Sequence, residues 1–531
     1  MFHKPRPDAL RLVAPLLLAL APSAAWAEPP AGFVEHVEAL RQDSGAPGIA
    51  IAIVEHGQTT LSHGWGVRRL GESAAVDEHT IFPTGSTGKA FTVAAIATLV
   101  DQGKLDWDDK VIDHIPWFQM YDPWVTREMT VRDLMVHRSG LGLGAGDLMF
   151  VPRTSLTRKQ TVERLRYIKP ATSFRSAYAY DNVLYVVLGQ LIEEVNGKTW
   201  EEYMASEVLA RGGMTDSTAT YDARYATANR ALPHGRVSGA IRGDGPNSVL
   251  DEHDELGRNA MPAGGLAMSA DDLAQWLKIQ LGYGALPGGG RLFSEEAARE
   301  MWTPVTPQPI DAWPGDLAPA TPKYSAYALG WDVEEYRGAR MIWHSGGVFG
   351  AIAVVVLLPD QDTGFAIVIN SEEAALRRGL MYELLDHYLG LPDNDWYRKW
   401  DTFVDARLAG GKAALAQMHD TPAQVGPSLP LATYAGTYRD PWYGDVVVSE
   451  RDGGLWINFA STPRMEGRLV HYQYDTFRTE LTDSKLENAL VTFQLDAHGK
   501  VERAKMVAAS PLADFSYDYQ DLDLRPVGDA K

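Results

Sequence analysis

The 531-residue chain contains no cysteine. A thiol nucleophile, a thiolate metal site and a disulfide framework are therefore excluded as sources of chemistry or of stability. The same absence excludes the lipid-attachment cysteine of an exported lipoprotein. A chain with 45% hydrophobic residues and this length can bury a large core without such cross-links, and its length predicts two or three domains.

Positive charge is also scarce. The chain has 49 Lys and Arg against 69 Asp and Glu, which gives a formal net charge of −20. Loss of residues 1–27, which hold three basic residues and one acidic residue, takes this to about −22. Nucleic acid and anionic membranes would repel such a chain. We therefore expect a small-molecule or short-peptide substrate, no nucleic acid partner and, after signal cleavage, no membrane partner.

Long apolar runs are absent after residue 27. Before it, Lys4, Arg6 and Arg11 form a basic region, Leu12 to Ala21 is apolar, and Ala25-Trp26-Ala27 has the small-residue pattern of a cleavage site. This order predicts a cleaved signal peptide over 1–27 and a periplasmic or secreted protein. The alternative, a membrane anchor, fits less well because the apolar run is short and is broken by proline.

Strand patterns lie at both ends of the first two-thirds of the chain, and helical patterns lie between them. The expected strands are Gly48–Glu55, Thr59–Val67, Arg340–His344, Ala351–Leu358 and Gly364–Asn370. We expect turns at His56-Gly57, Gly346-Gly347 and Pro359-Asp360, and helices over Phe33–Gln42, Leu184–Val195, Leu273–Leu281 and Ala374–Leu389. The predicted fold class is α/β (α+β), with one antiparallel sheet flanked by helices and an inserted helical region.

The last part of the chain has a different pattern. A polar helix and a Gly- and Pro-rich linker over 393–430 separate a first domain, 28–392, from a tail, 431–531. Short alternating runs predict a small all-β barrel-like tail, with strands over Tyr434–Tyr438, Asp445–Glu450, Gly454–Phe459, Leu469–Tyr474, Val491–Leu495 and Val501–Val507. The tail either covers an active-site mouth or packs against a partner subunit as a homo-oligomer. Two interpretations of Trp442 and Tyr443 are open: they form an exposed aromatic contact, or they lie in the core of the tail.

Ser86 and Lys89 stand three positions apart in Phe-Pro-Thr-Gly-Ser-Thr-Gly-Lys, at the start of an apolar helical pattern. This spacing puts both side chains on one helix face, so the lysine can reach the serine hydroxyl. The buried stripe of the helix is expected to consist of Val93, Ile96, Ala97 and Val100. Serine is a poor nucleophile by itself, and lysine becomes a usable base when burial lowers its pKa. The alternative is a helix-capping serine with a solvated lysine.

Further motifs decide between these alternatives. Tyr180-Asp181-Asn182 precedes a helical pattern, and His344-Ser345-Gly346-Gly347 closes a predicted strand, where a substrate backbone could pair along the sheet edge. Leu134 to Leu141 and Pro262 to Trp276 complete the set. In this order they resemble the serine β-lactamase and penicillin-binding-protein-like superfamily, in its class C, esterase and D-aminopeptidase branch. The tail resembles the lipocalin-like β domain that follows such domains.

The resemblance implies a role for each matched residue. Ser86 would be the acylated nucleophile, Lys89 its base, and Tyr180 a proton relay that needs neighbouring cations to hold its anionic form. Asn182 would orient Lys89 or the substrate amide, and His344, Ser345 and Gly346 would bind substrate. The backbone N–H groups of Ser86 and Gly347 would form the oxyanion hole. No cofactor or metal is implied.

Three of these segments also allow structural interpretations. Tyr180 would then be a packed aromatic, and Asn182 a helix N-cap. His137 and Ser139 are expected to hold a loop and are left out of the site. The acidic run 251–255 around His253 is expected to be a solvated charge run rather than a metal site, and no His-Glu-x-x-His motif is present.

His344 departs from the resembled family, whose β-lactamases and transpeptidases carry lysine at this position. That lysine is a permanent cation that anchors the carboxylate of penicillins, whereas a histidine with a pKa near 6.5 is mostly neutral. The predicted function is an exported serine hydrolase that cleaves an amide or ester through an acyl-enzyme at Ser86, as a peptidase on D-residue-containing peptides. The alternatives are a carboxylesterase or weak β-lactamase of this fold and a non-hydrolytic penicillin-binding-like interaction protein.

Overall fold

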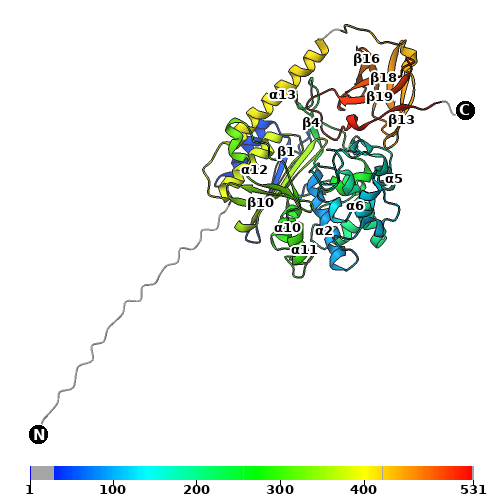
Figure 1. Ribbon diagram of the computed structural model, residues 1–531. Coiled ribbons are helices and arrows are strands. Elements are labelled where there is room, and N and C mark those ends of the chain that lie inside the picture. The colour runs from blue at the N-terminus through cyan, green and yellow to red at the C-terminus, as the bar shows by residue number, and fades with distance from the viewer. Residues whose placement is uncertain (2–28, 255, 421–422, 529–531) are drawn as a thin grey trace.

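The computed structural model describes Met1 and residues 29–254, 256–420 and 423–528 (Figure 1). The predicted signal peptide, apart from Met1, lies outside these residues. One large mixed domain and one smaller β domain are joined by a long helix, α13 (Trp396–Asp420). None of the helices in the described ranges combines the length and the apolar character needed to cross a membrane.

An antiparallel sheet of eight strands forms the centre of the large domain. Its order is β2-β1-β12-β11-β10-β9-β8-β7, so the first strands of the chain lie inside the sheet beside late ones. The β1 register pairs Ile49 with Ile369. The strands are β1 (Gly48–Glu55), β2 (Gln58–Gly66), β7 (Thr306–Pro307), β8 (Ser325–Tyr327), β9 (Asp332–Tyr336), β10 (Ala339–Val348), β11 (Ala351–Leu358) and β12 (Thr363–Ile369). The predicted antiparallel sheet built from both ends of this region is confirmed.

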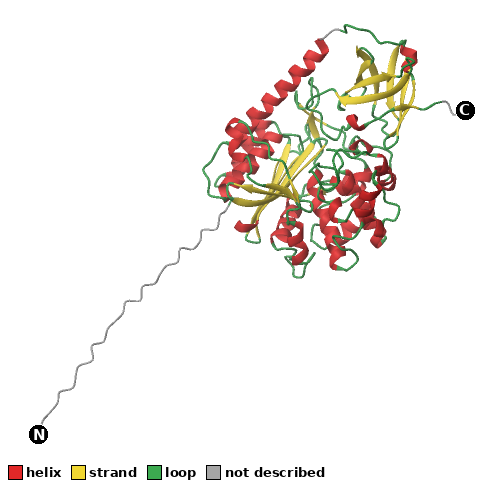
Figure 2. Cartoon of the chain, viewed as in Figure 1, coloured by secondary structure: helices red, strands yellow, loops and turns green. Residues whose placement is uncertain are grey.

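Helices cover both faces of this sheet (Figure 2). Alternation along β1 sends Ala50 and Ala52 into one hydrophobic cluster and Ile49 and Ile51 into the other. The first cluster includes α2 (Gly88–Asp101), α6 (Val183–Asn196) and α10 (Ala270–Leu281), and the second includes α1 (Phe33–Ser44), α12 (Ala374–Tyr388) and the start of α13. Because both faces are covered, every residue of β1 is buried.

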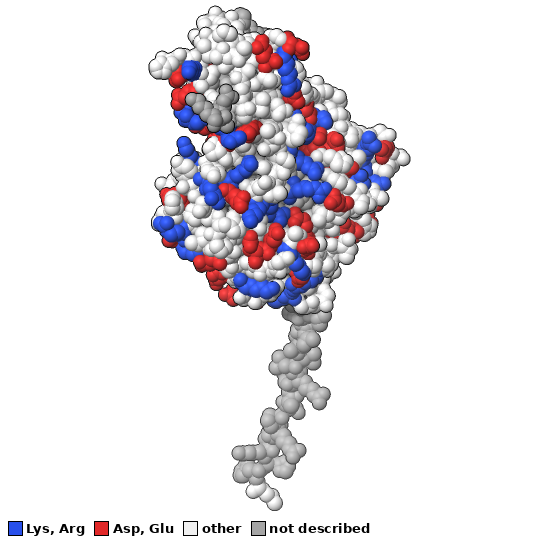
Figure 3. Space-filling model, turned by 90° about the vertical axis from the view of Figure 1, so that its right-hand side faces the viewer, with Lys and Arg blue, Asp and Glu red and all other residues white. Residues whose placement is uncertain are grey.

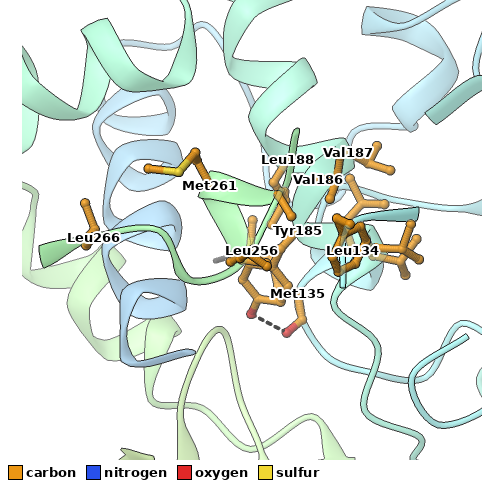
Figure 4. Close-up of a cluster of buried hydrophobic side chains, with 14 of the residues drawn as sticks. Leu134, Met135, Tyr185, Val186, Val187, Leu188, Leu256, Met261 and Leu266 are labelled. Atoms are coloured by element: carbon orange, nitrogen blue, oxygen red, sulfur yellow. Dashed lines mark hydrogen bonds between the residues drawn. The ribbon is translucent and has the colours of Figure 1, made fainter. Parts of the chain in front are cut away.

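The inserted helical region packs around α2 and α6. Tyr185 of α6 lies among apolar side chains and donates a hydrogen bond to the Met135 carbonyl at 2.9 Å (Figure 4). The remaining helices are α3 (Val111–His114), α4 (Pro123–Glu128), α5 (Arg158–Arg164), α7 (Trp200–Tyr203), α8 (Tyr221–Ala226), α9 (Met261–Gly264) and α11 (Glu295–Met301). Two short strand pairs, β3 (Phe82–Pro83) with β6 (Ala267–Met268) and β4 (His234–Arg236) with β5 (Asn247–Val249), lie outside the main sheet.

Two local predictions were wrong. Helix α2 has no single buried stripe, because its residues from Gly88 to Leu99 are all buried by the elements that surround it. Gly346 and Gly347 do not form a turn, because β10 continues through them to Val348 and pairs with β11 there. The turn lies at Gly350, whose φ of +77° glycine adopts without strain.

The C-terminal domain is an antiparallel sheet of eight strands in the order β19-β18-β17-β16-β15-β14-β13-β20. A bridge between Ala504 and Leu524 nearly closes it into a barrel. The strands are β13 (Gly436–Asp440), β14 (Gly444–Arg451), β15 (Gly454–Phe459), β16 (Glu466–Gln473), β17 (Thr476–Leu481), β18 (Ala489–Leu495), β19 (Val501–Ala508) and β20 (Arg525–Pro526). Trp442 and Tyr443 are buried, which favours their core interpretation.

Polar groups form part of the contact between the two domains. Arg164 donates hydrogen bonds to the carbonyls of Trp442 and Tyr443 at 3.1 and 2.6 Å, and Asp254 forms ion pairs with Arg464 and Lys485. On the face drawn in Figure 3, acidic and basic side chains are interspersed, so the net negative charge is not gathered into one patch there.

Gly346 of β10 lies against the turn that carries Ser86. A Cβ atom at Gly346 would be 1.9 Å from the Thr84 carbonyl oxygen, whereas one at Gly347 would have its nearest neighbour at 3.9 Å. We expect Gly346→Ala to lower the free energy of unfolding by about 2 kcal/mol or more, because a packed backbone must move. Gly347→Ala, the matched control, should change it by less than about 1 kcal/mol. Urea unfolding of both variants tests this, and equal stabilities would contradict the packing.

Candidate active site

Ser86 lies where the chain passes from β3 into α2. It belongs to a short 3₁₀ turn, η1 (Gly85–Thr87), whose backbone packs on β10. Gly85 has a φ of +55°, and a Cβ atom there would lie 2.5 Å from the Gly347 backbone nitrogen. Glycine is required at position 85 on both counts. The Gly346-Gly347 backbone is thereby brought directly against the Ser86 turn.

Lys89 is fully buried one turn further along, and three acceptors surround its Nζ atom. Nζ lies 3.0 Å from Ser86 Oγ, 2.6 Å from Asn182 Oδ1 and 2.9 Å from the Ala263 carbonyl oxygen. An amide oxygen and a carbonyl oxygen can only accept, so they take two N–H groups of Lys89. In the neutral amine the remaining position is the lone pair, and it points at the Ser86 hydroxyl.

Burial also sets the protonation of Lys89. Removal of the ammonium from water lowers its pKa to about 7, although the charges of Asp147 and Asp181 raise it in part. Nζ also lies 4.8 Å from the Tyr180 ring centroid and 5.1 Å from that of Tyr185. Near neutral pH a large share of the protein therefore holds Lys89 as the free amine.

Asn182 orients Lys89. Its side-chain oxygen accepts from Lys89, and its side-chain nitrogen donates to Asp147 Oδ2 at 2.7 Å. It occupies the N-cap position of α6 but makes no capping hydrogen bond with its side chain, so the N-cap interpretation of that side chain is wrong. The sequence pattern did not indicate Asp147, because it lies 35 residues before Asn182, in a short 3₁₀ helix, η3 (Asp147–Met149), with no motif around it.

Tyr180 is buried beside Ser86, and its hydroxyl forms no hydrogen bond of good geometry with a described residue. Burial raises the pKa of this phenol well above its usual value, and the neighbouring Ser86 hydroxyl offsets only part of the shift. The expectation that a cation holds Tyr180 as an anion is therefore wrong, because desolvation outweighs the nearby lysine. The ring packs 4.2 Å from the His137 ring, centroid to centroid.

His344 is buried with both ring nitrogens engaged. Nδ1 lies 2.6 Å from the Ser345 carbonyl oxygen, which can only accept, so Nδ1 carries the proton. Nε2 then accepts from the Tyr327 hydroxyl at 2.8 Å. Burial and the Lys89 charge lower the His344 pKa to about 3, so the ring is neutral at physiological pH. The predicted neutral histidine agrees with this geometry.

His137 and Ser139 hold the segment that carries the tyrosine. The Asp181 backbone N–H donates to His137 Nδ1 at 3.2 Å, and the Ser139 hydroxyl donates to an Asp181 carboxylate oxygen at 3.0 Å. The loop-holding interpretation of both residues fits these contacts.

In the acidic run 251–255, Glu252 forms an ion pair with Arg230 rather than lying free in solvent. The described residues contain no group of three or more His, Asp and Glu side chains arranged to hold a metal ion.

These side chains open on a cavity of about 1140 Å³ between the two domains. Six of the predicted site residues line it, namely Ser86, Tyr180, Asn182, His344, Ser345 and Gly347, whereas Lys89 and Gly346 lie behind the surface. Phe515 and Ser516 of the C-terminal domain also line it. The tail thus covers the mouth of the site, which is the first of its two predicted roles. Its residues could not be assigned to the site from any local motif.

Comparison with known proteins agrees with this geometry. The beta-lactamase family model matches residues 33–383, and a domain of unknown function, DUF3471, matches residues 420–526. The chain is 28% identical over 437 residues to the unguisins hydrolase ungD of Aspergillus violaceofuscus, covering 77% of this chain and 75% of that protein.

Two solved structures share the fold. The octameric penicillin-binding protein homologue from Pyrococcus abyssi aligns with a TM-score of 0.55 and 21% identity, over 90% of this chain and 98% of that one. The structure of SurE with D-Leu aligns with a TM-score of 0.50 and 19% identity, over 94% and 99% of the two chains. The chain therefore belongs to the beta-lactamase family and is a serine hydrolase of that family, followed by a DUF3471 domain.

Proposed function

We propose that this hydrolase is a peptidase that cleaves amide bonds in small peptides containing D-residues, through an acyl-enzyme on Ser86. The observation that carries the proposed chemistry is the set of acceptors around Lys89. Because Asn182 and the Ala263 carbonyl occupy two of its N–H groups, the free amine has its lone pair aimed at Ser86 Oγ. A weak nucleophile beside such a base is activated without a metal or cofactor.

In the first step, Ser86 Oγ attacks the substrate carbonyl carbon while its proton passes to Lys89. The oxygen of the tetrahedral intermediate takes hydrogen bonds from the Ser86 and Gly347 backbone N–H groups. Collapse of the intermediate breaks the bond to the leaving amine, which needs a proton. Tyr180 is suited to deliver it, because it is neutral and buried beside Ser86, and its hydroxyl donates to no other residue in the described part of the chain.

The proton then returns through Tyr180 to restore the starting state, since the protonated Lys89 lies 4.8 Å from the Tyr180 ring centroid. Water attacks the acyl carbon in the second half-reaction, and the same groups accept and return its proton. Each half-reaction therefore begins with a neutral amine and a neutral phenol. Neither half-reaction therefore needs Tyr180 to be a phenolate at its start.

An extended substrate fits the open part of β10. This strand pairs with β9 only over Ala339–Trp343, whereas its pairing with β11 continues to Val348. From His344 to Val348 one edge of β10 is therefore unpaired, and it runs beside the Ser86 turn. A peptide backbone can add to such an edge by main-chain hydrogen bonds. This favours a peptide over a compact ester.

A penicillin fits less well. The position of its carboxylate anchor is held by His344, which is neutral and uses both ring nitrogens within the protein. The structure of SurE with D-Leu, which shares the fold, supports a substrate with D-residues, and the relative from Aspergillus violaceofuscus is itself a hydrolase. The penicillin-binding protein homologue from Pyrococcus abyssi is octameric, which motivates a homo-oligomer here too. Export through the signal segment stays a prediction.

The substrate class is tested with a panel of chromogenic compounds. We expect D-alanyl p-nitroanilide to be hydrolysed with a kcat/KM at least about tenfold above that of its L isomer. A penicillin should be turned over more slowly than either, because the neutral His344 occupies the position of the lysine that would bind its carboxylate. Ser86→Ala should lose all these activities. A preference for the penicillin would contradict the peptidase proposal and favour a β-lactamase. Hydrolysis of p-nitrophenyl acetate with no cleavage of either anilide would favour an esterase.

The role of Lys89 as the base is tested by the pH dependence of kcat/KM and by substitutions that remove an amine. Because protonated Lys89 cannot accept the serine proton, kcat/KM should fall about tenfold per pH unit below about pH 7 and level off above it. Lys89→Met should lower kcat/KM by about 10³-fold. Lys104→Met, which changes an exposed lysine after the same helix, is the matched control. A flat profile from pH 5 to 9 in the wild-type protein would contradict Lys89 as the base.

A further inference from the structure

The segment of the C-terminal domain around Phe515 forms part of the active-site wall. The Phe515 ring packs edge-on to the Tyr180 ring, with the centroids 5.9 Å apart. A Cβ atom at Gly144 would lie 2.6 Å from the Phe515 carbonyl oxygen, so the loop of the large domain approaches this segment as closely as a glycine permits. The contact is therefore closely packed on the side of Gly144.

Hydrogen bonds attach the same segment to the short 3₁₀ helix that begins at Asp147. The Ser516 hydroxyl donates to Asp147 Oδ2 at 2.8 Å, with both side chains buried. Asp518 accepts from the backbone N–H groups of Gly146 and Leu148 at 2.6 and 2.9 Å. The backbone on either side of Asp147 is thus held by Asp518, and its carboxylate by Ser516, residues about 370 positions later in the chain.

Asp147 connects this contact to the nucleophile. Its Oδ2 atom also accepts from the Asn182 side-chain nitrogen at 2.7 Å, and Asn182 in turn accepts from Lys89. A continuous chain of hydrogen bonds therefore runs from Ser516 through Asp147, Asn182 and Lys89 to Ser86. The hydrogen bonds of a buried chain polarise one another, so removing the bond at one end changes the strength of the bonds at the other end.

The charge on Asp147 gives this chain an electrostatic consequence. Burial raises the Asp147 pKa to about 8, while the hydrogen bonds from Asn182 and Ser516 and the Lys89 charge pull it down and Asp514 pushes it up. An ionised Asp147 favours the protonated form of Lys89. The charged groups that bear on the pair are Asp181 next to α6 and Asp514 and Asp518 from the tail.

We propose that Ser516 is a positioning residue of the hydrolase, through which the C-terminal domain sets the orientation and the protonation of Lys89. The DUF3471 domain then supplies part of the catalytic machinery as well as covering the mouth of the cavity. Ser516 acts on Ser86 only through Asp147, Asn182 and Lys89. The inference rests on the serine hydrolase chemistry and is independent of which substrate the enzyme prefers.

The test is the rate at which a fluorophosphonate labels Ser86 in the full-length protein, followed by intact mass from pH 5 to 9. In Ser516→Ala, the Asp147 carboxyl keeps its proton to higher pH and opposes deprotonation of Lys89 less. The pH of half-maximal labelling should therefore fall by about 0.5 unit, and the plateau rate should fall about fivefold. Ser516→Thr, which keeps a hydroxyl, should move both values back toward those of the wild type.

Two further variants make the result specific. Ser510→Ala removes a tail hydroxyl that bonds only within the tail, to the Leu512 backbone N–H, and should leave the profile unchanged. Asp147→Asn should lower the pH of half-maximal labelling at least as far as Ser516→Ala does. An unshifted profile in Ser516→Ala, or an equal shift in Ser510→Ala, would overturn the inference. A wild-type protein that the probe does not label would instead overturn the proposed acyl-enzyme chemistry.

Discussion

Burial of Lys89 beside Ser86 is the constraint on which the rest of the structure depends. An amine enclosed on all sides loses the solvation that keeps it protonated, and its pKa falls to about 7. Such a group is costly to bury unless its N–H groups are bonded, and Asn182 and the Ala263 carbonyl meet this need. The complete burial of α2, with residues Gly88 to Leu99 inside the core, is what keeps water from the lysine.

Strand β10 of the main sheet forms the side of the site that faces Ser86. Because β10 carries glycine at 346 and 347, its backbone can lie directly against the η1 turn, where any side chain at Gly346 would strike the Thr84 carbonyl. The same strand has one open edge beyond Trp343, which is where an extended substrate can pair. Packing therefore places the nucleophile, a backbone N–H donor and a binding edge together. The C-terminal domain closes the remaining side through Phe515 and Ser516.

Much of this could be predicted from short motifs, because Ser86 with Lys89, Tyr180 with Asn182, and His344 with Gly346 each carry a local pattern. The antiparallel sheet followed from alternation in the segments at both ends of the large domain. The turn at Gly346-Gly347 was mispredicted because close backbone approach and a turn both select glycine. Asp147 and Ser516 could not be found, since they meet across 369 positions with no motif around either. The protonation state of Tyr180 depends on how deeply its hydroxyl is buried, and a sequence motif does not show burial.

The covalent intermediate is the central claim and can be measured directly. The protein is mixed with p-nitrophenyl acetate, quenched in acid within seconds, digested and mapped by mass spectrometry. The account predicts an acetyl group on the peptide that contains Ser86. The level in Lys89→Met should not exceed the wild-type level, because loss of the base slows formation of the adduct. An acetyl group on another residue, or turnover of the ester with no adduct on Ser86, would contradict it.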